Sequence, residues 1–379
     1  MRTLPASGFT SVLRAGNIQD ALNTCDDLIW VPEAMIDKEQ YLRAGDVAIC
    51  LSSGSASVVG KTAYCAEDTK SSVGAFCGIL RARGALDNRY LSFWLRSKDY
   101  QAWRDLQARG TNIQNLRFSE ISKIHLPLPP LSEQKRIAAI LKEQMAAAEK
   151  ARAAAMAQLE AAKALPAVYL RQVFPKEGQE LSPGWRWVTL GSVCDVVNGF
   201  GFPEHLQGRK DLPYPFIKVS DMNAPGAEVV VSSAVNTVDR GILDSLGARI
   251  YPSRTIIFPK VGGALLTNKK RLLGKDSCFD NNVMGLVPRD ADADFLFCWF
   301  QTVDLRTLCN VQALPSIKQS RIAALRFPMP AYTEQKRIAA VLNEQIASAE
   351  RLRNDIEKQL HEINALPAAL LRRAFSGEL

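Results

Sequence analysis

Histidine and paired cysteines are scarce in this sequence, and their scarcity limits the chemistry that we expect. The 379 residues include three histidines, which lie far apart and form no metal-ligand spacing. The eight cysteines contain no CxxC pair, and several lie in or next to apolar runs such as DVAICL and FLFCWF. Cysteine in such a run behaves as a small buried hydrophobe. We therefore expect reduced structural thiols, and neither a zinc site nor a disulfide framework.

Long apolar segments are also absent. No apolar run reaches the ~18–20 residues that a membrane span requires, and the N-terminus has no signal-peptide hydrophobic core. The sequence therefore predicts a cytoplasmic protein.

Recognisable catalytic motifs are missing as well. GSASVVGKT (54–62) has five residues between its glycine and GKT, where a P-loop has four, and no helical pattern follows it. We interpret it as a Gly/Ser loop that leaves Lys61 free to contact a DNA phosphate. EQK at 133–135 and 334–336 supplies part of some nuclease signatures, but no acidic partner precedes it on a strand. The sequence predicts no catalytic residue, cofactor site or metal site in this chain.

The composition is that of a globular protein with a basic surface. Apolar residues make up 47% of the chain and charged residues 23%, so wholesale disorder is not expected. The net charge of +8 favours a polyanionic partner, and nucleic acid is the first candidate. The length allows about two domains.

A long repeated segment dominates the sequence. LSEQKRIAAILKEQ begins the segment from Leu131 to Phe174, and YTEQKRIAAVLNEQ begins a near copy from Tyr332 to Phe375. The offset is 201 residues without a gap, and about half of the aligned positions are identical. Both copies have the composition of a long helix. The chain is therefore organised as two globules, each followed by a helix.

Local signals predict where the two helices begin and end. Ser132 and Thr333 are suitable N-cap residues, each followed by a glutamate that favours a helix N-terminus. The shared ALP tripeptide at 164–166 and 365–367 is expected to break or kink both helices at the same place, since proline lacks the N–H that the helix needs.

Heptad spacing predicts that the two helices pair. Apolar residues recur every seven positions in the second helix, at Leu342, Ala349, Ile356 and Ile363. The first helix has Leu141, Ala148, Ala155 and Ala162 at the matching positions. A bulky stripe opposite an alanine stripe allows close coiled-coil packing. The alternative is two independent amphipathic surface helices.

The two globules are each expected to be α+β. Similarity between the halves begins at 115–130 and 316–331, and the halves diverge before these segments. We expect strands within 185–197, 214–222, 254–263 and 44–53, and helices within 291–303 and 88–110. The expected domains are a first globule at 1–131, a central helix at 132–174, a second globule at 175–331 and a C-terminal helix at 332–379.

Basic and polar loops are the candidate DNA-binding elements. Lys, Arg, Asn and Gln side chains read base edges and anchor phosphates, although any one of these loops could equally be a solvated surface. The argument rests on similar loops in both halves. The candidates are Arg14, Asn17, Lys61, Asn112, Gln114, Asn115 and Arg117 in the first half, and Lys218, Lys260, Lys269, Lys270, Arg271, Ser316, Lys318 and Gln319 in the second.

These motifs together resemble one family. PLPPLSEQKRIAAIL and FPMPAYTEQKRIAAVL, each opening a long helix, and the closing LRRAFSGEL are similar to the specificity subunits of type I restriction-modification systems. GWRWVTLGSVCDVVNGF resembles the start of the target-recognition domains of that family. The resemblance covers essentially the whole chain.

The resemblance implies a division of labour. Each α+β globule would be a target-recognition domain that reads one half of a bipartite double-stranded DNA sequence. The two helices would pair antiparallel, and their length would set the unread spacer. Modification (methyltransferase) subunits would dock on the helices with S-adenosylmethionine, and restriction/motor subunits would bring ATP and Mg²⁺, so that this chain would direct methylation and cleavage without its own catalysis.

The first half departs from this pattern. The segment from Trp185 to Phe216 precedes IKVSDM in the second half, whereas only 12 residues precede the matching LRAGNI (13–18). The opening strand of the first globule is therefore expected to be missing or replaced by MRTLPASGFTSV, through a truncated gene or a misassigned start.

Two other functions remain as alternatives. A fused or stand-alone enzyme could cleave or modify DNA directly, but it would need a nuclease or methyltransferase motif. A coiled-coil scaffold could carry globules that bind protein instead of DNA.

Overall fold

The structure is a computed structural model that describes residues 7–19, 21–55, 57–107, 114–310 and 314–379. The contacts between Cα atoms divide the chain into two compact units. The first unit comprises Met1–Ala157 and Ile356–Leu379, and the second comprises Gln158–Asp355. Each long helix contributes one part to each unit.

A five-stranded sheet forms the centre of the second unit. Its order is β10-β17-β14-β15-β12, with β10 at Cys194–Asn198, β17 at Val283–Pro288, β14 at Ile256–Pro259, β15 at Arg271–Leu273 and β12 at Val230–Val231. All four residues of β14 are buried, which explains its apolar sequence IIFP. The helix α8 (Ala293–Thr302) packs Phe295 and Phe300 into the same core. Asp292 caps this helix by accepting the N–H groups of Asp294 and Phe295.

Two smaller sheets complete the second unit. The first has the order β13-β11-β16, with β13 at Asn236–Val238, β11 at Tyr214–Ile217 and β16 at Cys278–Phe279. The second pairs β18 (Arg326–Met329) with β9 (Arg186–Thr189). The short helices are α5 at Leu190–Val193, α6 at Arg240–Ser245, α7 at Gly262–Leu266 and α9 at Gln319–Ala323. The expected strand at 185–197 is thus two strands separated by the helical turn α5.

The described residues of the first unit also form three sheets. Their orders are β5-β3-β7, β2-β1-β6 and β4-β8, with β1 at Phe9–Leu13, β2 at Ile29–Pro32, β3 at Val47–Cys50, β4 at Ser52–Ser53, β5 at Thr62–Tyr64, β6 at Ser71–Val73, β7 at Cys77–Leu80 and β8 at Gln114–Asn115. The helices before the repeat are α1 (Asn88–Trp94), α2 (Lys98–Gln107) and α3 (Phe118–Ile121). The expected helix at 88–110 is therefore two helices.

The strand registers show that the two units share one topology. β1 pairs antiparallel with β2 and parallel with β6, and β11 pairs in the same two ways with β13 and β16. β3 lies between β5 and β7, as β14 lies between β15 and β17. Val47 faces Leu80, and Ile256 faces Leu286, so these pairs occupy equivalent positions. We call two residues equivalent below when these registers, or the repeat offset, place them at the same point of the two units.

The long helices are longer than the sequence signals predict. α4 spans Leu131–Val173 and α10 spans Tyr332–Phe375. Each begins one residue before the predicted cap. The predicted break at the ALP tripeptide is wrong, because both helices continue past Pro166 and Pro367. Each proline removes one helical hydrogen bond, and the packed residues on both sides of it compensate for that loss.

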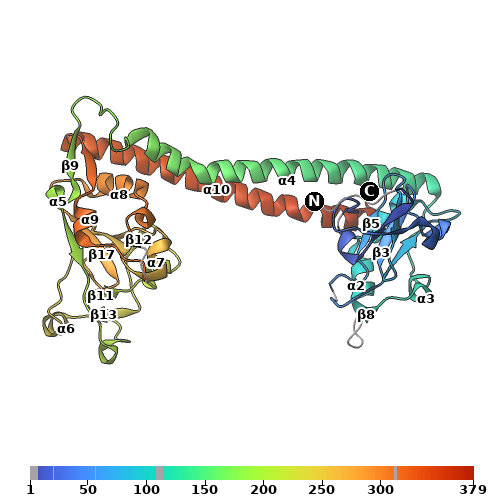
Figure 1. Cartoon of the computed structure of the whole chain (residues 1–379), viewed down its shortest axis with the longest axis horizontal. Helices are drawn as coiled ribbons and strands as arrows, with labels where there is room; N and C mark the ends of the chain where they lie inside the picture. The colour runs from blue at the N-terminus through green and yellow to red at the C-terminus, as the bar shows by residue number, and fades with distance from the viewer. Residues whose placement is uncertain (1–6, 20, 56, 108–113, 311–313) are drawn as a thin grey trace. The chain divides into compact units, whose positions relative to one another are not determined.

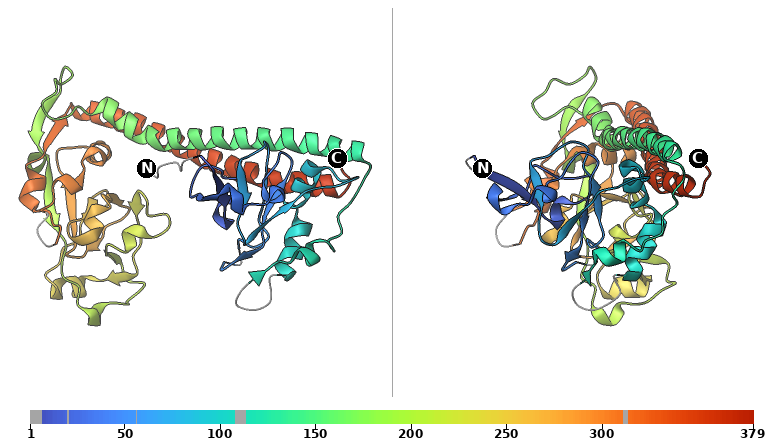
Figure 2. Two further views of the ribbon diagram at one scale, coloured as in Figure 1. Left: turned by 45° about the vertical axis from the view of Figure 1, so that its right-hand side comes forward. Right: turned by 90° about the vertical axis from the view of Figure 1, so that its right-hand side faces the viewer.

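The two helices pack against each other antiparallel in each unit. In the first unit, Leu141 near the start of α4 shares a core with Leu371 near the end of α10. In the second unit, Leu170 near the end of α4 shares a core with Leu342 near the start of α10. The alanines of the α4 stripe are buried, as Ala155 shows at 4% exposure. The predicted coiled-coil pairing is confirmed, and Figures 1 and 2 show the paired helices from different directions.

A buried glutamine anchors each helix to its globule. The Gln134 side chain accepts the Asp87 N–H (2.8 Å) and donates to the carbonyl oxygens of Ala85 and Pro129. Gln335 accepts the Asp292 N–H (2.9 Å) and donates to the Pro330 carbonyl. Both side chains are fully buried. The glutamine of EQK therefore joins the helix to the first turn of α1 or α8.

Within the described part of the chain, no helix combines the length and the hydropathy that crossing a membrane would require.

Candidate nucleic-acid interface

Three strands of the second unit meet at one edge of the main sheet. β10 and β14 end there and β17 begins there, because both strands run antiparallel to β17. The residues at this edge are Asn198, Lys260 and Asn282. Gly199 must be glycine, since a Cβ atom there would lie 2.0 Å from the Asp280 carbonyl oxygen. The sequence therefore brings distant polar residues together at this edge.

A chain of hydrogen bonds fixes the polar side chains of the edge. Lys260 Nζ donates to Asn198 Oδ1 (2.9 Å), and Asn198 Nδ2 donates to Gln319 Oε1 (2.8 Å). Gln319 Nε2 donates in turn to the Val196 carbonyl oxygen of β10. Burial lowers the pKa of Lys260, and the neighbouring Asp280 opposes that shift. We call Asn198, Lys260 and Gln319 the polar edge.

The segment before α9 continues the polar edge. Ile317 N–H donates to the Lys260 carbonyl (3.0 Å), and Asn310 N–H donates to the Ser316 carbonyl (2.9 Å). These backbone bonds hold Ser316 and Lys318 beside β14, and both residues are exposed. Four predicted residues, Lys260, Ser316, Lys318 and Gln319, therefore lie together.

A second basic group lies on the turn that follows β11. Lys218 N–H donates to Asp221 Oδ2 (2.7 Å), which closes the turn. Lys218 Nζ donates to Gln207 Oε1 (2.7 Å) and lies 5.9 Å from the centre of the Phe202 ring. Lys269 Nζ donates to Asn223 Oδ1 at the end of the same turn. These cations are half-buried.

Lys270 is not available to DNA. Its side chain is 2% exposed, and Nζ donates to the Val303 carbonyl (2.6 Å) and to Asn268 Oδ1 (3.1 Å). Burial lowers the pKa of Lys270 to about 8. Arg271 is half-buried, and its Nη1 donates to the Lys270 carbonyl. We remove Lys270 from the candidates, because its side chain points inward to the Val303 carbonyl and Asn268.

The first unit repeats the backbone geometry of this region with other side chains. Leu116 N–H donates to the Leu51 carbonyl (2.7 Å), as Ile317 donates to Lys260. Leu51 is thus equivalent to Lys260. Asn115, Arg117 and Lys61 are exposed. Gln114 is described only by its backbone pairing with Ser53, and Asn112 lies outside the described residues.

The turn after β1 contains two predicted DNA-binding residues, of which Asn17 is buried and Arg14 is exposed. Asn17 is 2% exposed, its Oδ1 accepts the Arg14 N–H (2.9 Å), and its Nδ2 donates to the Asp26 carbonyl (2.8 Å). It closes the turn as Asp221 does in the second unit, so its side chain cannot read a base. Arg14 is equivalent to Lys218; it is exposed and pairs with Asp27.

Sequence reasoning missed Asn198. It contacts residues that are 62 and 121 positions away in the chain, and no local pattern links them. The only local signal is an Asn-Gly pair at the end of a strand.

The arrangement suits binding to a polyanion. Cations for phosphates and amides for base edges lie on loops that a rigid sheet holds in place. Among the described residues, no group of three or more His, Cys, Asp or Glu side chains could hold a metal ion.

Comparisons with known proteins agree with this architecture. A family model described as "Type I restriction modification DNA specificity domain" matches residues 3–157 and 183–362. The StySPI specificity subunit of Salmonella potsdam, a type I restriction enzyme subunit, is 26% identical over 392 residues, covering 98% of this chain and 82% of that protein. The EcoKI specificity subunit of Escherichia coli K12 is 24% identical over 394 residues, with the same two coverages.

Two solved structures share the fold. One belongs to work described as "Structural basis underlying complex assembly and conformational transition of the type I R-M system", with a TM-score of 0.73, 19% identity, and coverage of 98% of this chain and 92% of that chain. The HsdS subunit from Thermoanaerobacter tengcongensis gives a TM-score of 0.66 at 19% identity, with coverages of 98% and 91%. Since the family model matches both halves, the chain belongs to the type I restriction-modification DNA specificity family.

Proposed function

We propose that this chain is the DNA sequence-specificity subunit of a type I restriction-modification system. It recognises double-stranded DNA and leaves catalysis to other subunits. The observation that carries the proposal is the pair of equivalent units, which hold exposed polar loops at the same point of one topology. Membership of the specificity family supports the same function.

Each unit reads one half of a bipartite target. Equivalent backbone positions carry different side chains, such as Lys260 in the second unit and Leu51 in the first. Different side chains at one position of a shared fold give different base preferences. The residues proposed to contact DNA are Arg14, Lys61, Gln114, Asn115 and Arg117 in the first unit, and Lys218, Lys260, Lys269, Arg271, Ser316, Lys318 and Gln319 in the second; Asn112 remains a proposal from the sequence.

The paired helices hold the two units and carry the partner subunits. Modification subunits would dock on exposed faces of α4 and α10 and bind S-adenosylmethionine, and motor subunits would act with ATP and Mg²⁺. The complex would work in the cytoplasm, on the cell's own and incoming DNA.

Sequencing the methylated bases of cells that express this chain with its modification subunit tests the proposal. A methylated motif with two specified halves and an unspecified spacer is expected. An unchanged methylome in cells where both proteins are detected and assemble would contradict it. Cells that express the modification subunit alone are the control.

The spacer can be tested separately. Seven added residues, or two turns, in α4 between Ala148 and Ala162, with a matching insertion in α10, lengthen each helix by about 10 Å. This corresponds to about three base pairs of DNA. The spacer should widen while both specified halves stay the same. If the insertion changes the bases within either half, the helices do more than set the spacing.

A further inference from the structure

β7 in the first unit lacks a neighbour that its equivalent has. β17 lies between β14 and β10 in the second unit. In the described part of the first unit, β7 pairs with β3 alone, and no strand corresponds to β10. The outer edge of β7 therefore presents unpaired backbone groups, which favour pairing with another strand.

A second segment of the first unit also lacks its partner. β18 pairs with β9 in the second unit, from Arg326 with Thr189 to Met329 with Arg186. The equivalent residues, 125–128, form no strand among the described residues. The two unpaired segments correspond to the two strands that flank α5, so the described residues of the first unit include no counterpart of the continuous β9–α5–β10 element.

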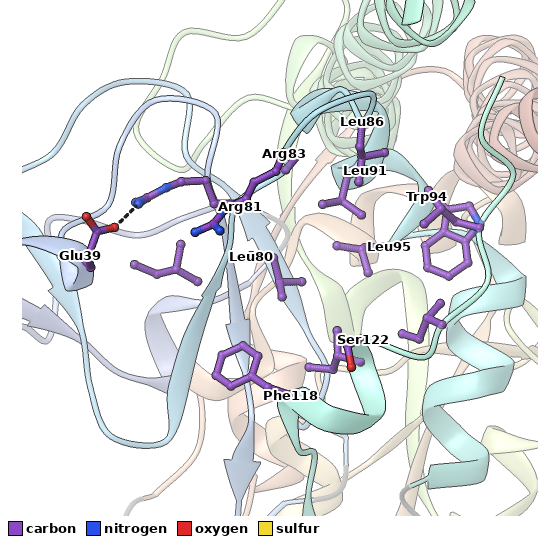
Figure 3. A pocket seen from close by; sticks show the side chains of 15 residues that line it. Glu39, Leu80, Arg81, Arg83, Leu86, Leu91, Trp94, Leu95, Phe118 and Ser122 are labelled. Atoms are coloured by element: carbon purple, nitrogen blue, oxygen red, sulfur yellow. Dashed lines mark hydrogen bonds and ion pairs between the residues drawn. The ribbon is translucent and has the colours of Figure 1, made fainter. Parts of the chain in front are cut away.

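A groove of about 530 Å³, with an apolar floor and the charged side chains of Glu39, Arg81 and Arg83 beside it, lies between these two segments. Figure 3 shows side chains from β7, α1 and α3 pointing into it. Its lining includes Leu80, Leu91, Trp94, Leu95, Phe118 and Leu126. In the second unit, Leu190, Val193 and Val196 from the β9–α5–β10 segment are buried in the core at the equivalent place. The groove has the position and the apolar lining that such a segment needs.

Three side chains at the groove lack the contacts that their position would allow. Phe118 is 50% exposed and is equivalent to Gln319, which donates to the β10 backbone. Trp94 Nε1 is buried and has no acceptor among the described residues. Arg83 is exposed, and the described residues include no ion-pair partner for it.

Arg83 indicates the charge of the missing partner. It lies three residues after Leu80, as Arg289 lies three residues after Leu286. Arg289 pairs with Asp195 of β10 (3.3 Å) and donates to the Gly191 carbonyl (3.1 Å). A segment that fills the groove would therefore carry an acidic residue opposite Arg83.

We propose that the groove binds a strand–turn–strand segment of a second polypeptide. Its first strand pairs with residues 125–128, its turn covers Leu91 and Phe118, and its second strand pairs antiparallel with β7 and brings a carboxylate to Arg83. Its chemistry is that of residues 184–199 of this chain, with alternating apolar side chains and one acidic residue on the second strand. The proposal does not depend on DNA recognition.

Adding a labelled synthetic peptide of residues 184–199 to the full chain tests this binding. Fluorescence anisotropy measures the affinity, and hydrogen exchange of residues 77–83 reports whether the peptide pairs with β7. We expect saturable binding and slower exchange at β7. A peptide with Val196→Asp should lose binding, because that side chain enters the apolar groove.

Charge variants sharpen the test. Arg83→Glu in the chain should weaken peptide binding about five-fold, and an Asp195→Arg peptide should restore it on that variant. Arg96→Glu, an exposed cation outside the groove, is the matched control and should leave the affinity unchanged. Two results would overturn the proposal. One is that millimolar peptide neither binds the chain nor slows hydrogen exchange at β7. The other is that two copies of the chain form a dimer in which hydrogen exchange at β7 is already slow without peptide.

Discussion

Lys260 and Leu51 occupy the same point of two units that share one topology. In the second unit, the lysine donates to Asn198, which is held by Gln319. In the first unit, the leucine is half-buried, and the residue equivalent to Gln319 is Phe118. In both units the backbone carbonyl at this point accepts an N–H from the segment just before α3 or α9. The two units thus share the strand registers that determine the fold, whereas a few positions at the sheet edge, such as those of Lys260 and Gln319, have different side chains.

The two units are most alike at the buried glutamines Gln134 and Gln335, which anchor each long helix. Gln134→Leu removes the partner of three backbone groups, and Gln335→Leu removes the partner of two. Each unpaired buried group costs roughly 1–3 kcal/mol, so we expect losses of about 3 and about 2 kcal/mol in the free energy of unfolding. Hydrogen exchange of each unit measures these losses separately. Lys135→Leu, at the exposed neighbouring position, should cost little, and equal small losses for all three variants would refute the anchoring role.

A buried lysine, Lys270, is present in the second unit and has no charged counterpart at the equivalent position of the first. Its pKa is about 8 in the folded chain against an ordinary value of 10.5, so the unfolded chain binds more protons between these pH values. The contribution of Lys270 to the stability of the second unit should therefore rise with pH from about 8 to 10.5, by about 3 kcal/mol, while buried thiols with raised pKa values, such as Cys194 and Cys278, oppose it above about pH 9. Below pH 8 the lysine is charged in both states and the penalty is constant.

The stability advantage of Lys270→Met over the wild type should therefore shrink by this amount as the pH rises from 8 to 10.5, and unfolding of both chains across the pH range measures it. The exposed Lys275→Met is the matched variant and should follow the wild type at every pH. The first unit has Thr62 at the equivalent position and should show no such contribution. A constant difference between the wild type and Lys270→Met across this pH range would contradict the assignment to Lys270.

Arg14 and Lys218 are equivalent cations of the two units. We expect their substitution to have the smallest effects, which are on DNA binding. Each follows the central strand of a three-stranded sheet. Arg14→Ala and Lys218→Ala should each weaken DNA binding a few-fold and lower the slope of log K against log salt by about one. Asp27→Asn removes the partner of Arg14 and should strengthen binding slightly. Equal slopes for all variants would mean that neither cation contacts a phosphate.

The long helices could be predicted well, because their repeat and heptad spacing are local signals. Their continuation past the ALP tripeptides could not, since packing on both sides of Pro166 and Pro367 outweighs the lost hydrogen bonds. The strands of both units could be predicted only in part. The LGSV turn of α5 forms because Leu190 and Val193 are both buried in the core, which no local pattern reveals.

The candidate interface was predictable where it lies on one continuous loop. Ser316, Lys318 and Gln319 adjoin one another in the sequence, whereas their link to Asn198 depends on the register of β10 with β17. Lys269 and Lys270 are adjacent and look identical in sequence. In the structure, Lys269 points toward Asn223 and Lys270 into the core, just before β15 begins.

The most direct test of the account is the methylated motif produced by the Lys260→Leu/Gln319→Phe variant, which gives the second unit the side chains of the first at two equivalent positions. The variant and the wild type are expressed with the same modification subunit, and Arg186→Ala, an exposed change on β9, is the control. The account predicts that one half of the split motif changes or becomes degenerate while the other half and the spacer are retained. Equal changes in both halves, or an unchanged motif from the folded variant, would contradict it.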